Sequence, residues 1–305
     1  MRQALSDVLV NLGKSDSNVL LLTGDHGYAL FDSFRKECPG QYINVGIAEQ
    51  NMVGVAAGLA RLGFRPIVYG LSAFIPIRVL EQVKLDVAHD SLPVIFIGDG
   101  AGFVYSHLGT SHQCTEDIAC SRVIPNLSVY SPADRFELTK CMITAYQENS
   151  SVYLRIGKAD CGDIHQSPPN IKAGELIKVR SAKKVKYSFI ATGSMVVTAI
   201  DVADALSSDI DVWSVPFIKP IDHLMIEKIC QNSEAIVVFE EHSKYGGLGS
   251  LIAEISSEFS PVKILKISVN DCFSQKCGTY KYLLQEHGLD FPAVYKNVHN
   301  FLQGR

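Results

Sequence analysis

Residues 42–62, YINVGIAEQNMVGVAAGLARL, constrain the fold of this chain more than any other stretch. The pattern predicts a short strand, a turn at Gly46, and a helix over 52–62 whose apolar positions run almost all the way round, as in a buried helix. Glu49 falls in the first turn, where the helix dipole favours the carboxylate and burial favours the protonated acid. We therefore expect Glu49 to exchange a proton, although an acid can also simply complete a helix N-terminus.

The order of strand, turn and helix recurs along the chain. In the first half we expect strands at 18–23, 42–45, 66–70, 93–97 and 152–155, and helices at 2–13, 75–90 and 133–148. In the second half we expect strands at 187–191, 210–215 and 235–240, and helices at 195–206, 222–230 and 249–259. This alternation predicts an α/β protein with two three-layer α/β/α domains, each with a mostly parallel sheet. The expected domains are residues 1–162 and 185–305, joined by a linker over 163–184.

Charge and cysteine content narrow the class of protein. The net charge is −4 with no basic stripe, which argues against nucleic-acid binding, and no run approaches the ~18 apolar residues needed to span a bilayer. The amino terminus lacks the apolar core of a signal peptide, so we expect a cytoplasmic protein. The eight cysteines form no CxxC pair, which predicts buried thiols rather than zinc ligands or disulfides.

Polar and glycine-rich segments follow several expected strands, at 23–26, 71–74 and 98–100. Ligands gather at the carboxyl ends of strands in a parallel sheet, so these segments are candidate site loops. A long polar loop then carries His107 and His112 before a short helix expected to begin near Thr115. A histidine there can donate a proton near neutral pH, although histidines also occur in ordinary surface loops.

The segment GIAEQNM and the Gly/Ala-rich helix after it resemble the pyrimidine-binding domain of transketolase-family enzymes, which use thiamine diphosphate. The resemblance implies that Glu49 hydrogen-bonds N1′ of the cofactor's aminopyrimidine and so promotes loss of the thiazolium C2 proton. It implies that Phe74 stacks on the same ring, with core packing as the alternative. Asp25 is assigned to the cofactor site, and His112 is expected to point at the substrate oxygen beside C2.

The substrate side departs from the family pattern. Typical transketolases and deoxyxylulose-phosphate synthases carry an aspartate four residues before the histidine that corresponds to His112, and this aspartate contacts a substrate hydroxyl. This chain has Leu108 there, which predicts a substrate other than the usual sugar phosphate. His107 and Arg155 are further substrate-site candidates. Arg155 is expected to bind an anionic end or, as an equal alternative, to form a structural ion pair.

Gly98-Asp99-Gly100, followed by Asn126, imitates the motif with which the family's other domain binds Mg²⁺ and the diphosphate. Glu49 already assigns this module to the pyrimidine side, so we interpret the motif as a turn and expect no metal site in this chain. A complete transketolase begins with a diphosphate-binding domain, for which the sequence offers no other candidate. The resemblance therefore implies that a separate amino-terminal subunit supplies the diphosphate and Mg²⁺ site.

The turns ATGSM, FIKPID and EEHSKYGGLGS resemble the carboxy-terminal domain of transketolases and of 2-oxo acid dehydrogenase β subunits. Glu240, Glu241 and His242 are interpreted as turn and interface residues. The resemblance as a whole implies the C-terminal subunit of a split transketolase, a transferase of carbohydrate metabolism that moves a two-carbon ketol unit between sugars. Two pairs of subunits would form a heterotetramer. The alternatives are a 2-oxo acid dehydrogenase β subunit and a non-catalytic structural paralogue.

Overall fold

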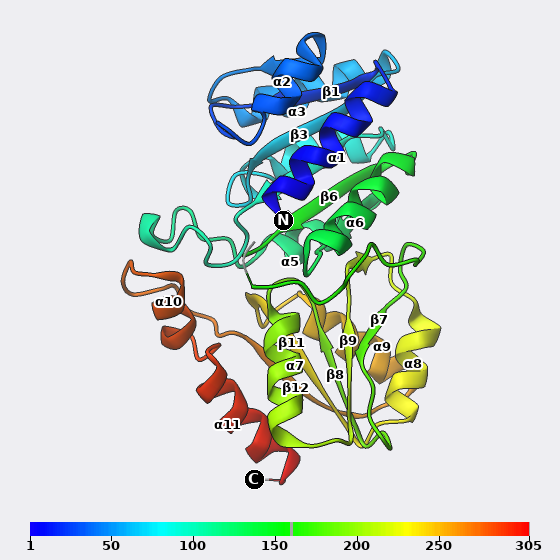
Figure 1. Ribbon diagram of the computed structural model, residues 1–305, viewed down its shortest axis with the longest axis vertical. Helices are drawn as coiled ribbons and strands as arrows, with labels where there is room; N and C mark the ends of the chain where they lie inside the picture. The colour runs from blue at the N-terminus through cyan, green and yellow to red at the C-terminus, as the bar shows by residue number, and fades with distance from the viewer. Residues whose placement is uncertain (159–160, 305) are drawn as a thin grey trace.

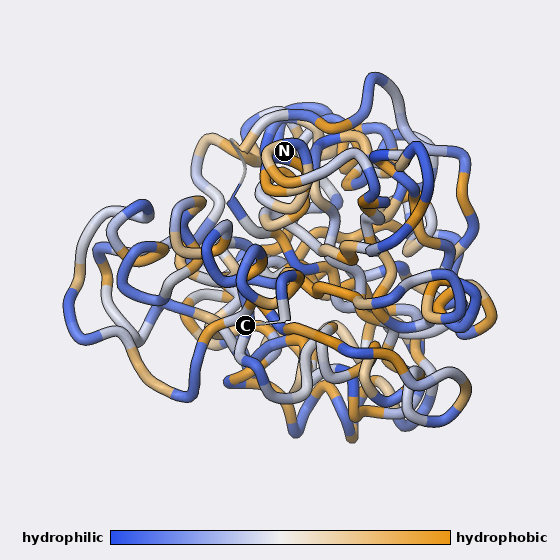
Figure 2. The backbone as a smooth tube through the Cα atoms, turned by 90° about the horizontal axis from the view of Figure 1, so that it is seen from below, coloured by the Kyte–Doolittle hydropathy of each residue, from blue (hydrophilic) through white to orange (hydrophobic). Residues whose placement is uncertain are grey.

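Two β-sheets built from runs of buried Val, Ile and Leu organise the chain, and a computed structural model describes residues 1–158 and 161–304. The two domains lie one above the other along the long axis of the molecule, with helices on both faces of each sheet (Figure 1). Hydrophobic segments gather towards the middle and hydrophilic loops towards the outline (Figure 2). The predicted class, α/β with two three-layer domains and mostly parallel sheets, is confirmed.

The first sheet has seven strands in the order β10-β5-β6-β4-β3-β1-β2. Their bounds are β1 Val19–Thr23, β2 Tyr42–Asn44, β3 Arg65–Leu71, β4 Ile95–Asp99, β5 Leu127–Tyr130, β6 Ser151–Ile156 and β10 Phe217–Lys219. All neighbours pair in parallel except β10, which comes from the second half of the chain and joins β5 antiparallel. The sequence analysis missed β5 and β10, because strands of three or four residues show too little periodicity.

Helices α1 Arg2–Ser15, α2 Asp32–Glu37 and α6 Arg135–Gln147 cover one face of this sheet. Helix α3, Glu49–Arg61, covers the other face together with a helical segment over 77–88. Helix α5, Asp117–Arg122, lies at the boundary between the domains. It begins close to the start expected near Thr115.

Helix α3 is buried on one face only, so the prediction of burial all round is wrong. Met52, Val53 and Ala56 are buried, whereas Gly54 and Gly58 face outward. Glycine counts as apolar in the sequence pattern, yet it has no side chain that would gain by burial. An apolar count therefore overstates how much of this helix the core covers.

The helix expected over 75–90 is divided into three short pieces. A 3₁₀ turn, Ile77–Val79, leads into α4, Leu80–Gln82, and then into a π-helical turn, Val83–Ala88. Pro76 lacks an amide hydrogen, so regular helical bonding begins only after it. The 3₁₀ turn leaves Arg78 partly exposed beside the start of α3.

The second sheet has five strands in the order β12-β11-β8-β9-β7. Their bounds are β7 Ile177–Arg180, β8 Tyr187–Ala191, β9 Ile210–Ser214, β11 Ala235–Ser243 and β12 Lys263–Val269. The helices of this half are α7 Met195–Leu206, α8 His223–Gln231, α9 Leu248–Phe259, α10 Tyr280–Glu286 and α11 Phe291–Leu302. Strand β7 lies inside the segment expected to be a linker and pairs antiparallel with β9.

The cysteines differ in exposure more than the sequence analysis predicted. Four are buried as expected: Cys38, Cys114, Cys141 and Cys230. Cys272 and Cys277 are exposed, because both lie in the irregular connection between β12 and α10. Across the described part of the chain, no helix is both long and apolar enough to cross a membrane.

Candidate active site

The candidate site forms where two neighbouring strands of the first sheet end and helix α3 begins. His26 follows β1, Phe74 follows β3, and Glu49 opens α3 after β2. The ring centroids of His26 and Phe74 lie 6.3 Å apart, and those of Phe74 and His112 lie 5.4 Å apart. These strand ends are the edge of a parallel sheet where ligands bind. The structure thus brings together Glu49, Phe74 and His112, with Arg78 joining Glu49 to Phe74.

Glu49 is a nearly buried carboxylate with one cationic partner. The residue is 6% exposed, and its Oε2 accepts a hydrogen bond of 3.0 Å from Nη1 of Arg78. A carboxylate in this setting needs compensating charge, which the Arg78 guanidinium and the positive end of α3 both supply. The bond from Arg78 occupies Oε2, so Oε1 is left for a second donor.

Phe74 is half-buried and carries the Arg78 guanidinium on its ring. The guanidinium carbon lies 3.9 Å from the ring centroid, a cation–π contact. His112 meets the same ring edge-on, at an interplanar angle of 65°. Phe74 is therefore not a simple core residue, and its ring is surrounded by the polar side chains of the site.

The sequence analysis missed Arg78. Its position four residues after Phe74 gives no helical signal, because Pro76 lies between the two residues and the 3₁₀ turn begins only at Ile77. The contact with Glu49 across 29 positions carries no local signal either.

His112 lies at the site, whereas His107 and Leu108, which come earlier in the same loop, face solvent. Nδ1 of His112 lies 2.9 Å from the Ser111 hydroxyl. His107 and Leu108 are exposed on a 3₁₀ turn, Ser106–Leu108, in the loop that projects from the body of the domain (Figure 1). Their assignment to the substrate side stays a prediction.

Asp25 lies in the loop after β1 and is exposed. Its carboxylate accepts a hydrogen bond from the Tyr28 hydroxyl, so the structure gives it a local partner rather than Glu49 or Phe74. Its place in the cofactor site stays a prediction.

Arg155 lies apart from this group, in the interior of the protein. It is 2% exposed, its Nε donates to Oδ2 of Asp117 at 2.8 Å, and its Nη2 donates to the Glu241 carbonyl oxygen at 2.7 Å. Asp117 is fully buried and also accepts from the Tyr153 hydroxyl at 2.7 Å. The structural ion pair, named above as the alternative to substrate binding, is the arrangement found.

Glu240, Glu241 and His242 belong to the buried strand β11, so their interpretation as turn residues is wrong. The Glu241 carboxylate accepts from the Phe103 amide at 2.6 Å and from the Ser194 hydroxyl at 2.7 Å. Since Phe103 belongs to the first half of the chain and Ser194 to the second, Glu241 links the two domains.

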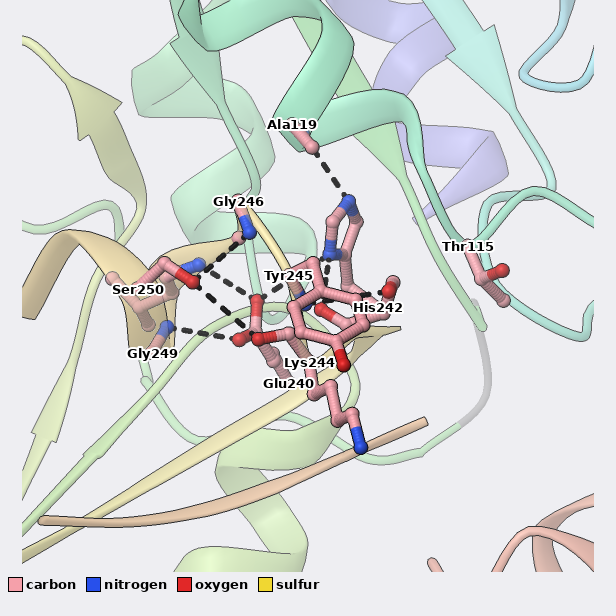
Figure 3. Close-up of polar contacts among 12 residues, drawn as sticks. Thr115, Ala119, Glu240, His242, Lys244, Tyr245, Gly246, Gly249 and Ser250 are labelled. Carbon is pink, nitrogen blue, oxygen red and sulfur yellow. Dashed lines mark hydrogen bonds and ion pairs between the residues drawn. The ribbon is translucent and has the colours of Figure 1, made fainter. Parts of the chain in front are cut away.

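Figure 3 shows the polar contacts of Glu240 and His242, which lie on the same strand, β11. The Glu240 carboxylate accepts the Gly249 amide at 2.8 Å at the start of α9, and burial raises the pKa of Glu240. Nε2 of His242 accepts the Ala119 amide at 3.2 Å, which joins β11 to α5. Nε2 is an acceptor in this contact, so the proton of the neutral ring belongs on Nδ1. The contact of His242 with Ala119 fixes the two domains against each other.

The residues of the GDG motif at 98–100 take part in the packing of the first domain. Oδ2 of Asp99 accepts hydroxyl hydrogen bonds from Tyr69 at 2.7 Å and Tyr105 at 3.2 Å, and burial raises the pKa of Tyr105 to about 12. Gly100 has φ +81°, and a Cβ there would approach the Tyr105 ring to 2.0 Å. Glycine is required at this position because of that ring.

Comparisons with known proteins agree with this fold. The family described as "Transketolase, pyrimidine binding domain" matches residues 1–162, and "Transketolase, C-terminal domain" matches residues 175–294. A solved structure described as a split gene transketolase, an inactive β4 tetramer, superposes with a TM-score of 0.88 at 31% identity, covering 98% of this chain and 96% of that one. Fold and site together define the class as a two-domain transketolase-type protein.

Two curated relatives are similar over almost their whole length. The 6-deoxy-6-sulfo-D-fructose transketolase subunit of Clostridium sp. is 31% identical, over 98% of this chain and 93% of the relative. An apulose-4-phosphate transketolase subunit of Phocaeicola vulgatus is 31% identical, over 99% of this chain and 97% of the relative. The chain belongs to the transketolase family, whose members generally use thiamine diphosphate and act as transferases.

Proposed function

We propose that this chain is the C-terminal subunit of a split transketolase-like enzyme, which transfers a two-carbon ketol unit between sugars with thiamine diphosphate. One observation carries the proposal. A nearly buried carboxylate, Glu49, and an aromatic ring, Phe74, lie together at the ligand-binding edge of the first sheet, with His112 against the same ring. A purely structural paralogue has no need for this combination.

The residues present fit the pyrimidine end of the cofactor. Glu49 offers a carboxylate oxygen to a ring nitrogen, and Phe74 offers an aromatic face on which a flat heterocycle can stack. When bound, the cofactor supplies the carbanion chemistry, and the chain supplies orientation and proton exchange at Glu49. His112 is placed to stabilise negative charge that develops on a substrate oxygen.

The diphosphate and Mg²⁺ are assigned to a separate N-terminal subunit. Relatives that match this chain over nearly their whole length are described as subunits, and the solved β4 tetramer is described as inactive. These descriptions support an enzyme that needs its partner, and we propose that it is assembled from two copies of each chain.

The two relatives named above share the same 31% identity with this chain and are described for different sugars. The usual pattern has a carboxylate at this position, near a substrate hydroxyl. This chain has Leu108 there instead, exposed in the projecting loop. We therefore propose a sugar that lacks this hydroxyl or presents it differently.

The test is reconstitution with an N-terminal transketolase subunit. The chain is purified alone and together with such a subunit, and each preparation is titrated calorimetrically with thiamine diphosphate and Mg²⁺. We expect micromolar cofactor binding, and ketol transfer, only in the mixed complex. Micromolar binding by the chain alone would contradict the split enzyme, and decarboxylation of 2-oxo acids by the complex would favour the dehydrogenase alternative.

A further inference from the structure

Arg78 makes both contacts that a pyrimidine would need in this site. Its guanidinium carbon, Cζ, lies over the Phe74 ring at 3.9 Å from the ring centroid, while Nη1 lies 3.0 Å from Oε2 of Glu49. A guanidinium is planar, cationic and rich in donors, and it stacks on aromatic rings. In these respects it resembles an aminopyrimidine that is protonated on the ring nitrogen facing a carboxylate.

The two contacts define one position. A flat ligand that stacks on Phe74 and also reaches the Glu49 carboxylate must lie on the side of the Phe74 ring that faces this carboxylate. The single Arg78 guanidinium joins the two groups, so it lies on that side. Two groups in van der Waals contact with one face of one ring exclude each other.

Arg78 can move without unfolding its surroundings. Its side chain is 46% exposed and it lies on a short 3₁₀ turn rather than within a long helix. The ion pair is open to solvent on its Arg78 side, and a cation–π contact with a half-exposed partner is of modest strength. A ligand of useful affinity can therefore displace the guanidinium.

We propose that Arg78 occupies the aminopyrimidine position of the unliganded chain and must leave Phe74 before the cofactor ring can bind. This inference rests on the proposed cofactor site. Arg78 is then a positioning residue that keeps Glu49 paired and the Phe74 ring covered until the ring arrives. It lowers the affinity for any ligand that cannot displace it.

The experiment measures binding of thiamine, which carries the aminopyrimidine without the diphosphate, to the full-length chain. Side-chain Nε–Hε signals of arginine are followed by NMR during the titration, and the Arg78 signal is assigned from Arg78→Lys. Affinity is compared among the wild type, Arg78→Ala and Phe74→Ala. Arg61→Ala is the matched control, because Arg61 is 49% exposed and pairs with Asp90 at the other end of α3.

We expect Arg78→Ala to bind thiamine roughly tenfold more tightly than the wild type, from the loss of one cation–π contact and one half-exposed ion pair. Arg61→Ala should match the wild type, and Phe74→Ala should bind more weakly. In the wild type, the Arg78 signal should shift as thiamine binds, because the guanidinium leaves the ring.

Two results would overturn the proposal. Equal or weaker binding by Arg78→Ala, with binding still dependent on Phe74, would show that Arg78 does not compete with the ring, and it would leave the proposed cofactor site intact. An absence of thiamine binding to Arg78→Ala up to the solubility limit would contradict both the Arg78 proposal and the assignment of the pyrimidine site.

Discussion

Replacing Asp117 by asparagine should destabilise the protein far more than the same replacement at an exposed ion pair. Asp117 is fully buried, and its Oδ2 accepts from both Arg155 Nε at 2.8 Å and the Tyr153 hydroxyl at 2.7 Å. The substitution leaves the buried Arg155 charge without its counterion. Removing one partner of a buried pair typically costs about 3–5 kcal/mol.

This cost is large beside the free energy of unfolding of a typical domain, about 5–15 kcal/mol. Asp90→Asn is the matched control, since Asp90 accepts from Arg61 at 2.7 Å with both side chains partly exposed. Exposed pairs contribute about 0–1 kcal/mol. The difference between the two variants should therefore be at least about 2 kcal/mol.

The assay is equilibrium unfolding in urea, followed by far-UV circular dichroism for the whole chain and by the fluorescence of Trp213 for the second domain. Both probes should report the loss, because the Arg155 guanidinium also donates to the Glu241 carbonyl of the second domain. If Asp117→Asn unfolds within about 1 kcal/mol of Asp90→Asn, the energetic argument about this buried pair is wrong.

Three further predictions concern the reconstituted complex. Glu49→Gln should preserve assembly yet slow exchange of the cofactor's C2 proton by about 10²–10⁴-fold, measured by NMR, with the exposed Glu37→Gln as control. His112→Asn should lower kcat by a similar factor of about 10²–10⁴ in a steady-state assay, with little change in cofactor affinity. Leu108→Asp should raise kcat/KM for xylulose 5-phosphate relative to the native substrate by up to roughly tenfold, since one added hydrogen bond contributes about 0.5–1.5 kcal/mol, whereas Leu62→Asp should not. No gain from Leu108→Asp would remove Leu108 as a determinant of specificity.

The strands and helices that the sequence predicted best are long and regular. Helix α7 begins and ends where its pattern predicted, whereas α3 begins at Glu49, ahead of the predicted start at Met52. Both carry a clear turn or helix-start signal next to an apolar run, and such signals depend only on neighbours in the chain. Strand β10 was missed because its three residues show too little periodicity, and its pairing with β5 joins segments far apart in the sequence.

The candidate site, like the fold, could be predicted from the sequence only where local patterns define it. Glu49, Phe74 and His112 stand in recognisable local patterns, and the structure brings them to one edge of the sheet. The role of Arg155 stayed open between two alternatives, because a strand-end arginine has the same local pattern whether it faces a ligand or a buried carboxylate. Only the fold shows that Asp117 is its partner.

The contacts between the domains imply that the site depends on the second domain, although none of its central side chains comes from there. Strand β11 holds the loop before His112 through the Phe103 amide and holds helix α5 after it through Ala119. The His112 loop is thus fixed at both ends by one buried strand of the other domain. A loop fixed in this way loses less conformational entropy when substrate binds than a free loop would. Substitutions at Glu241 should therefore weaken substrate use as well as stability, and the two effects should appear together.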